Sequence, residues 1–303
     1  MVEKRLKNLR QGQRSLSKKY KTQHKTGRLS ENERDAYLHA RLPATSSVCK
    51  KVLSHIHEKN KIQRILDLGC GPGSATYAAL EVFEGIKQVH LVDRDKGYTY
   101  DFSVPHTFSN VGLEQFEVCN EYDLAIASYV FNECPHELLV TLLPQVWQKI
   151  TSYFIIIEPG TPFGYQSFLK SRDILINCGA SLVAPCPHEK TCPLSENDWC
   201  HFKERLIRSP VHQQVKSGAR SFEDESYIYG VFAKQPPQER ANRILKKPRK
   251  GSGHISFDLC TPHGVEKKII SRKSKESFLK AKKLSWGDVL KRDNANKKNE
   301  LHE

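Results

Sequence analysis

The sequence lacks the features that would place the chain in a membrane or on a secretory route. No apolar run among its 303 residues approaches the roughly 18 residues of a membrane-spanning helix, so we expect no membrane partner. The N-terminus has no apolar stretch of the signal-peptide kind, so we expect no ordinary secretion. Nine cysteines without that route indicate thiols, a metal or a cluster in a reducing compartment, and not disulfides.

The charge is distributed unevenly along a chain whose 38% hydrophobic content is ample for a core. Residues 1–30 hold 10 basic and 1 acidic residue, and residues 239–303 hold 18 basic and 8 acidic. The stretch between them, 31–238, holds 20 basic and 25 acidic residues. Basic ends on an acidic body are typical of a polyanion partner. Solvating Lys-rich tails are the alternative, but aromatic and β-like residues among the C-terminal charges favour nucleic acid.

The hydrophobic pattern divides the chain into four parts. Residues 1–30 are predicted to be a basic flexible arm, and 31–60 to be helices that begin after Ser30 as N-cap. Strands alternate with helices over 61–235, which predicts a parallel α/β sheet. Residues 236–303 are predicted to be a small basic β module with a tail.

Within the α/β part, the boundaries of strands and helices are placed where the spacing of hydrophobic residues changes. We expect strands in 88–95, 122–133, 152–160 and 225–235, and helices in 136–150 and 164–179. The stretch 184–206 is rich in proline and polar residues, so we expect no regular element there. Its cysteine-rich portion is 184–202.

A glycine-rich loop follows the first strand and opens a helix, which is the context that a nucleotide-binding loop needs. Its sequence, Asp67-Leu-Gly-Cys-Gly-Pro-Gly73, departs from the dinucleotide fingerprint because Ser74 stands where the third glycine belongs. It resembles motif I of S-adenosylmethionine-dependent methyltransferases. Asp93, or nearby Asp95, ends the next strand and offers acceptors for ribose hydroxyls. The alternative is a tight turn that binds nothing; we predict a cofactor site at Asp67, Gly69, Gly71, Gly73 and Asp93.

The sequence lacks the groups that would identify a methyl-transfer chemistry. The loop 128–133 is not of the Asn-Pro-Pro-Tyr type that holds a planar nitrogen, and no catalytic cysteine pair is present. Cys134 lies near this loop, and we interpret it as a packing thiol. No residue is therefore predicted to be catalytic.

Four cysteines fall in or after the irregular segment with the spacing C-x5-C-x7-C-x59-C. Thiolates on irregular backbone suit a tetrahedral sulfur site, but the C-x2-C pairs of a zinc ribbon are absent. Two of the cysteines precede proline, which favours an iron–sulfur cluster over zinc. Free packed thiols are the third possibility. The predicted ligands are Cys186, Cys192, Cys200 and Cys260, and the histidines that would replace one of them around zinc are His188, His201 and His263.

Several segments together resemble one family, the methyltransferase-like assembly factors of the mitochondrial small ribosomal subunit and their bacterial relatives. The resemblance covers about residues 35–290, and the cysteine segment is its most specific part. The segments are RLPAT, LDLGCGPGSATYAA, IIIEPGTPFGY, LVAPCPHEKTCPL, DWCHF, EDESYIYGV, KKPRKGSGHISFDLC and SWGD.

The resemblance implies a Rossmann-like methyltransferase fold with N-terminal helices, a four-cysteine cluster-binding insertion and a C-terminal β module. It implies S-adenosylmethionine as cofactor and a structural [4Fe–4S] cluster on the four cysteines, with zinc as the alternative. The implied partners are small-subunit ribosomal RNA and the assembling small subunit, and we expect a monomer. We expect a bacterial cytoplasmic protein, with the mitochondrial matrix as the alternative.

Two functions follow from this resemblance. The first is an assembly factor in which methyl transfer has been lost. The alternative is an active ribosomal-RNA methyltransferase, which needs a target base near Asn132, Glu133 and Glu158.

Overall fold

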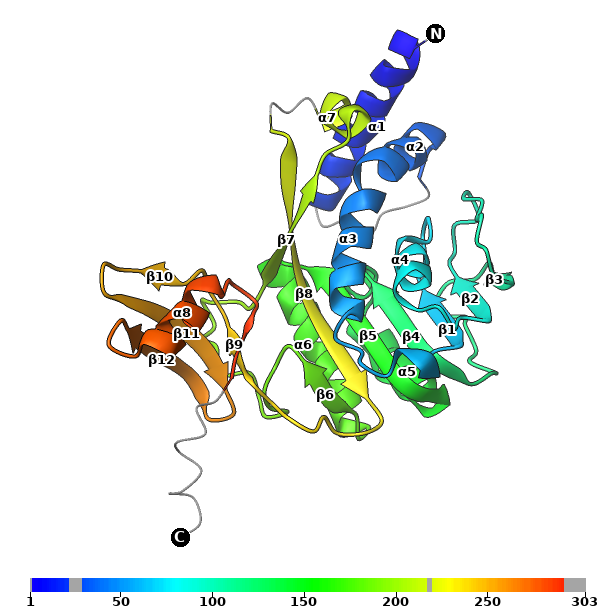
Figure 1. The fold of residues 1–303 in the computed structure, drawn as a ribbon. Coiled ribbons are helices and arrows are strands. Elements are labelled where there is room, and N and C mark those ends of the chain that lie inside the picture. Colours follow the sequence, from blue (N-terminus) through cyan, green and yellow to red (C-terminus); the bar gives the residue numbers. More distant parts are fainter. Residues whose placement is uncertain (1, 22–28, 217–219, 292–303) are drawn as a thin grey trace.

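Figure 1 shows the chain in a computed structural model that describes residues 2–21, 29–216 and 220–291. The larger part is an eight-stranded sheet with helices on both faces, and the smaller part is a five-stranded antiparallel sheet with one helix. None of the helices within these ranges is long and apolar enough to cross a membrane.

The central sheet contains β1 (Arg64–Leu68), β2 (Gln88–Val92), β3 (His106–Ser109), β4 (Tyr122–Ser128), β5 (Ile150–Pro159), β6 (Ser181–Ala184), β7 (Phe202–Ile207) and β8 (Phe222–Ala233). Their order is β3-β2-β1-β4-β5-β8-β6, and β7 also pairs with β8. The strands β1 to β5 run parallel, which confirms the α/β prediction, and β8 is antiparallel to β5. The chain moves outward from β1 to β3 and then returns to β4 on the other side. The carboxyl ends of β1 and β4 therefore form a switch point, where ligands bind in such sheets.

Four helices cover the two faces of this sheet, namely α3 (Leu42–Leu53), α4 (Ser74–Val82), α5 (His136–Lys149) and α6 (Pro162–Asn177). Helices α3 and α4 pack together on one face, and α5 and α6 on the other, as right-handed crossovers require. The run Ile155–Ile157 of β5 is fully buried between these layers. Two single-turn helices, η1 (Lys59–Lys61) and η2 (Phe131–Glu133), lie in connecting loops.

A helical cap stands above the sheet and consists of α1 (Val2–Lys21), α2 (Glu31–Ala40) and α7 (Pro210–Lys216). We expected residues 1–30 to be a flexible arm, and this prediction is wrong for α1, which packs on α2 and α7. Leu9 and Leu16 are buried on one face of α1, with Gly12 between them. A Cβ at Gly12 would lie 2.1 Å from the carbonyl oxygen of Asn32, so this glycine lets the two helices approach closely. Residues 22–28 of the expected arm lie outside the described residues.

Polar contacts also fasten α1 to α2. The predicted N-cap at Ser30 is confirmed, and Ser30 forms a capping box with Glu33. The carboxylate of Glu33 is buried and accepts hydrogen bonds from Ser15 Oγ at 2.7 Å and Lys19 Nζ at 2.9 Å. These bonds outweigh the effect of burial and lower the pKa of Glu33 to about 2. The cap is thus held by an ionic contact as well as by apolar packing.

The irregular stretch expected over 184–206 ends earlier than the sequence suggested. Residues from Phe202 onward form β7, which pairs with the first half of β8 as an antiparallel ribbon. Phe202 is buried at the base of the ribbon, whereas Lys203, Arg205 and Ile207 of β7 are exposed to solvent. The strand β7 was not predicted because its sequence is polar; it forms because it pairs with the long strand β8.

The C-terminal module contains β9 (Asn242–Ile244), β10 (Arg249–Lys250), β11 (His254–Thr261), β12 (Gly264–Ser271), α8 (Lys275–Lys283) and β13 (Val289–Leu290). Its strand order is β10-β11-β9-β13, with β12 on β11. Phe257, Leu259, Ile270 and Phe278 pack in a small core of its own. The predicted tail beyond residue 291 lies outside the described residues.

Candidate cofactor pocket and cysteine site

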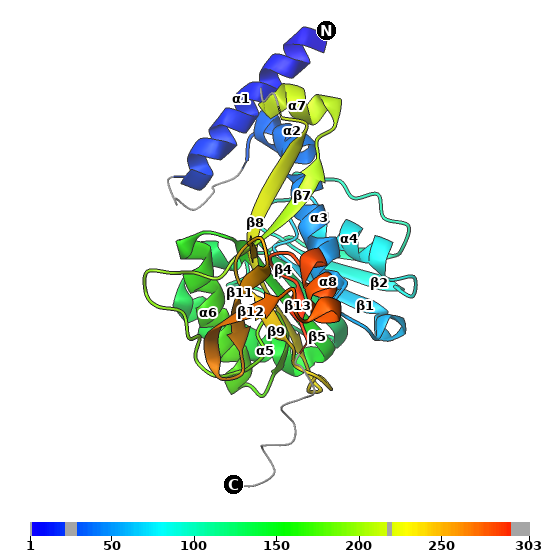
Figure 2. The ribbon, with the colours of Figure 1, turned by 60° about the vertical axis from the view of Figure 1, so that its left-hand side comes forward.

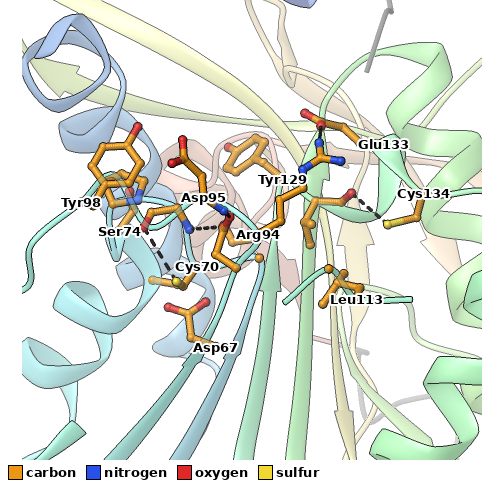
Figure 3. Close-up of a pocket in the computed structure, with 18 of the residues that line it drawn as sticks. Asp67, Cys70, Ser74, Arg94, Asp95, Tyr98, Leu113, Tyr129, Glu133 and Cys134 are labelled. Carbon is orange, nitrogen blue, oxygen red and sulfur yellow. Dashed lines mark hydrogen bonds and ion pairs between the residues drawn. The ribbon is translucent and has the colours of Figure 1, made fainter. Parts of the chain in front are cut away.

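A cavity of about 460 Å³ opens at the carboxyl ends of β1, β2 and β4, and Figure 3 shows its lining side chains. This volume suits a small organic ligand. Tyr37 of α2 and Thr45 of α3 also line the cavity, so the N-terminal helices complete it. The pocket therefore lies at the switch point of the sheet, beneath the helical cap.

The three glycines of the loop adopt left-handed backbone conformations, with φ of +64° at Gly69, +50° at Gly71 and +83° at Gly73. A Cβ at Gly69 would lie 2.4 Å from Val130 Cγ2, so packing also requires glycine there. A Cβ at Gly71 would meet no atom within 4 Å, because this residue borders the cavity. Gly69 and Gly71 line the pocket; Gly73 is instead the N-cap of α4 and is not among its lining residues.

Asp67 is buried at the end of β1 and borders the pocket. Its Oδ2 accepts a hydrogen bond of 2.6 Å from Thr76 Oγ1 on α4. Burial raises the pKa of Asp67 to about 7, against the effect of this bond. Asp67 therefore connects the strand with the helix that follows the glycine loop.

Asp93 ends β2 and supports the glycine loop directly. Its Oδ2 accepts a hydrogen bond of 2.8 Å from the Gly71 amide, and its Oδ1 accepts one of 2.8 Å from the Asp95 amide. Burial raises the pKa of Asp93. Each oxygen keeps a second lone pair, so the predicted role toward ribose hydroxyls is compatible with the bonds already made.

Unpartnered polar atoms in this pocket belong to residues that sequence reasoning missed. Ser74 Oγ, Tyr98 OH and Tyr129 OH are buried there without a hydrogen-bond partner among the described residues. Tyr129 also has a φ of 59°, which is strained for a residue other than glycine. Such orphaned groups are expected where a polar ligand binds, so the lining fits a nucleoside-like cofactor.

Two charged residues that line the pocket form an ion pair. Arg94, which follows β2, lies 3.6 Å from the carboxylate of Glu133, which follows β4. Cys134 lies next to this pair, and burial raises the pKa of its thiol to about 12. An unreactive thiol agrees with its interpretation as a packing residue.

The buried acid Glu158 has a structural position. Its carboxylate accepts hydrogen bonds from the amides of Phe131 at 2.9 Å and Asn132 at 3.3 Å, which fixes the loop after β4. It is fully buried and is not among the pocket-lining residues, and neither is Asn132. Of the three residues considered near a target base, only Glu133 borders the pocket.

The structure brings the four predicted cysteine ligands to one small cavity between α6, β8 and the C-terminal module. Three of them come from the irregular segment before β7, and Cys260 comes from β11. All four are free thiols. Tyr165 OH donates a hydrogen bond of 3.0 Å to Cys192 Sγ, and His188 Nε2 lies 3.7 Å from Cys260 Sγ.

The chemistry of the lining bears on which group these thiols suit. Within the described ranges, no group of three or more His, Cys, Asp or Glu side chains is placed to hold a metal ion. The four thiols nevertheless line a common cavity whose other lining residues are mostly apolar. Four soft sulfur donors suit either zinc or a polynuclear thiolate-bound cluster. Of the candidate histidines, His201 stacks on Trp199, and neither His201 nor His263 lines this cavity.

Comparison with known proteins identifies a family. Residues 31–291 match the family model described as Rsm22, mitochondrial small ribosomal subunit Rsm22. The Rsm22-cox11 tandem protein 2 of Schizosaccharomyces pombe is 27% identical over 84% of this chain and 42% of its own length. The human ribosome assembly protein METTL17 is 24% identical over 84% of this chain and 61% of its own length. The chain thus spans about half the length of these mitochondrial relatives.

Solved structures with a similar fold include human N-acetylserotonin methyltransferase in complex with SAM. It has a TM-score of 0.41 and 14% identity, and the match covers 68% of this chain and 56% of that one. Magnesium protoporphyrin IX methyltransferase from Synechocystis, with bound SAH, has a TM-score of 0.40 and 13% identity over 73% and 94% of the two chains. These proteins share with the chain an α/β fold built on a mixed sheet.

Proposed function

The chain belongs to the Rsm22 family, and from this premise we propose that it is a small-ribosomal-subunit assembly factor that binds S-adenosylmethionine, a [4Fe–4S] cluster and ribosomal RNA. The observation that carries the proposal is the convergence of Cys186, Cys192, Cys200 and Cys260 on one cavity. Cys260 is 60 residues beyond Cys200 in the sequence and belongs to the other module, and a chance set of packing thiols has no reason to meet at one place.

The cluster has a structural role in this proposal. The C-terminal module has a small core of its own. A cluster bonded to cysteines of this module and of the α/β part would fix the module in place. Cys260 is the module's ligand, and the other three come from the α/β side. The four thiolates would hold the cluster, which supplies a rigid cross-link, while Tyr165 donates a hydrogen bond to one of the sulfurs.

S-adenosylmethionine would occupy the pocket at the switch point. The backbone of Gly69 and Gly71 lets the ligand approach closely, and Asp93 offers acceptors to its ribose. The unpartnered hydroxyls of Tyr98 and Tyr129 would gain partners. Of the acids considered near a target base, Glu158 is buried and fixes the loop after β4, and Glu133 borders the pocket but is paired with Arg94. This favours an assembly role over the methyltransferase alternative.

Ribosomal RNA would contact the basic surfaces. Helix α1 presents exposed Arg5, Lys7 and Arg14, and the C-terminal module presents exposed residues such as Lys267 and Arg272. Phosphate contact by such side chains gives a salt-dependent affinity. The relatives named above are called mitochondrial, so we place the chain in the mitochondrial matrix and not in the bacterial cytoplasm that we expected. A monomer remains a prediction.

The proposal is tested by anaerobic purification, with iron, sulfide and zinc counted per chain and the absorption near 400 nm recorded. We expect about four irons and four sulfides. One zinc without sulfide would contradict the cluster.

Calorimetry then measures S-adenosylmethionine binding, which Gly71→Arg should abolish because the new side chain enters the pocket. Gly253→Arg is the matched control, since a Cβ there also meets no atom within 4 Å but lies outside the pocket.

The RNA part of the proposal has its own measurement. The purified protein should bind small-subunit ribosomal RNA more tightly than an unrelated RNA of the same length, at several salt concentrations. Equal affinity for both RNAs would contradict a specific assembly role. Transfer of labelled methyl to immature subunits would instead support the methyltransferase alternative.

A further inference from the structure

A buried arginine borders the cysteine cavity. Arg243 lies on β9 directly across the strand pair from Cys260, and it is 6% exposed. Its Nε donates to the carbonyl oxygen of Pro185 at 3.0 Å, and its Nη1 donates to that of Gly287 at 2.8 Å. Both acceptors are neutral, and Arg243 forms no ion pair with a carboxylate in the described part of the chain.

A second arginine approaches from α6. Arg172 is 1% exposed, and its Nη2 donates to the carbonyl oxygens of Lys190 at 2.7 Å and His188 at 3.3 Å. Its Nη1 bonds Asp173, whose side chain is 59% exposed and therefore a weak counter-charge. The Nε of Arg172 is buried and finds no acceptor among the described residues.

The positive charges of these two buried guanidiniums have no buried negative partner in the described part of the chain. A buried cation is costly unless a counter-charge accompanies it. No carboxylate is among the residues that line this cavity, where Arg243 lies beside the four cysteines. Arg172 holds the carbonyl oxygens of His188 and Lys190, which belong to the segment between Cys186 and Cys192.

We propose that Arg172 and Arg243 are positioning residues that neutralise the negative charge of a thiolate-bound cluster in this cavity. The inference rests on the proposed function, since it assumes that the cysteines bind a cluster. Four thiolates outweigh the positive charge of the cluster core, so the whole group is an anion. Two buried guanidiniums without a buried carboxylate partner match an anion held by these cysteines. Arg243 also joins the modules, because Pro185 belongs to the α/β part and Gly287 to the C-terminal module.

The charge of a cluster's surroundings sets its reduction potential, which makes the potential a reporter of local charge. Replacing a nearby cation by a neutral side chain disfavours the more negative, reduced cluster. We expect Arg243→Gln and Arg172→Gln each to lower the reduced-to-oxidised ratio about tenfold at a fixed potential, a shift of about 59 mV to more negative values for one electron. Arg243→Lys and Arg172→Lys keep the charge and should retain most of the wild-type potential.

The experiment compares these variants with wild type and with Arg249→Gln, which removes an exposed arginine from the same module. Iron and sulfide are counted per chain, and the midpoint potential is measured by a titration with dithionite followed by electron paramagnetic resonance. Lower potentials in the glutamine variants, with Arg249→Gln unchanged, would support the inference.

The failures of the two proposals are distinguishable. Wild type without iron and sulfide would overturn the cluster and this inference with it. Wild type with a full cluster, and glutamine variants with an unchanged potential, would overturn only the role of the arginines. Because each arginine also holds two backbone carbonyls, either glutamine variant can lose the cluster through misfolding; the variant that keeps full iron and sulfide then decides, and loss of the cluster from the lysine variants as well would show that the arginines hold the backbone and not the charge. Lysine variants that shift as far as the glutamine variants would show that hydrogen-bond geometry, and not charge, sets the potential.

Discussion

Two buried acids, Asp67 at the pocket and Glu158 behind the loop that follows β4, give the fold a pH dependence. Burial raises the pKa of Glu158 to about 8 and that of Asp67 to about 7. Both return to their ordinary values near 4 when the chain unfolds. Between about pH 4 and pH 8 the folded chain therefore holds protons that the unfolded chain releases. Since stability falls with rising pH wherever the folded state binds more protons, we expect these acids to make the protein less stable as the pH rises through this window.

Glu158→Gln tests this dependence. The amide cannot ionise, so the fall of the unfolding free energy between pH 5 and pH 8 should become shallower than in wild type. The variant should also be less stable throughout by about 1–3 kcal/mol, because one of the two amide donors faces the new NH₂ group. The measurement is the urea midpoint at several pH values. Glu84→Gln, at an exposed position, is the control; an unchanged slope in Glu158→Gln would refute the assignment.

At the scale of residues, the sequence predicted the part of the pocket that lies in one contiguous motif. Asp67, Gly69 and Gly71 line the cavity because strand, loop and helix follow one another directly. Tyr98 and Tyr129 were missed because they come from separate loops after β2 and β4, and no spacing rule connects them. The left-handed backbone of Tyr129 has no signal in the sequence.

At the scale of elements, the docked helix α1 is the largest departure from the sequence-based expectation. Its apolar face is narrow and is surrounded by lysine and arginine, so composition alone suggested a flexible arm. The burial of Leu16 and the hydrogen bonds from Ser15 and Lys19 to the Glu33 carboxylate of α2 explain why α1 docks. In contrast, β1, β2, β4 and β5 were predicted because parallel strands buried on both faces form continuous apolar runs. The edge strand β3 was missed because it is short and largely exposed, so it has no such run.

Leu16→Ala is expected to loosen α1. The side chain is 1% exposed, and replacing a buried leucine by alanine costs about 2–5 kcal/mol. Because the loss falls on one docked helix, we expect faster hydrogen exchange throughout α1, with the central sheet unchanged. Leu38→Ala, at a leucine of α2 that is 39% exposed, is the matched control. Equal exchange in α1 of both variants would contradict the docking described above.

At the scale of the whole molecule, the α/β part and the C-terminal module both contribute residues to the cysteine cavity. The α/β core is extensive, whereas the C-terminal module packs few apolar side chains around Phe257 and Phe278. A core of that size gives little stability by itself. The four cysteines were predicted as one site, with Cys260 in the β module of residues 236–303, and the structure has Cys260 on β11 of that module.

If a cluster joins the two modules, loss of one ligand should release the smaller one. We expect Cys192→Ala to lose iron and sulfide, to lower the melting temperature by roughly 5–10 °C, and to speed hydrogen exchange in β9 to β13 more than in β1 to β5.

Cys119→Ala is the control because Cys119 is an exposed thiol away from the cavity. Tyr165→Phe isolates the hydrogen bond to Cys192 Sγ, since it removes the donor and keeps all four thiols. Iron lost without faster exchange in the module would show that the cluster does not hold the modules together. Unchanged iron in Cys192→Ala would remove Cys192 from the ligand set and leave its thiol a packing residue.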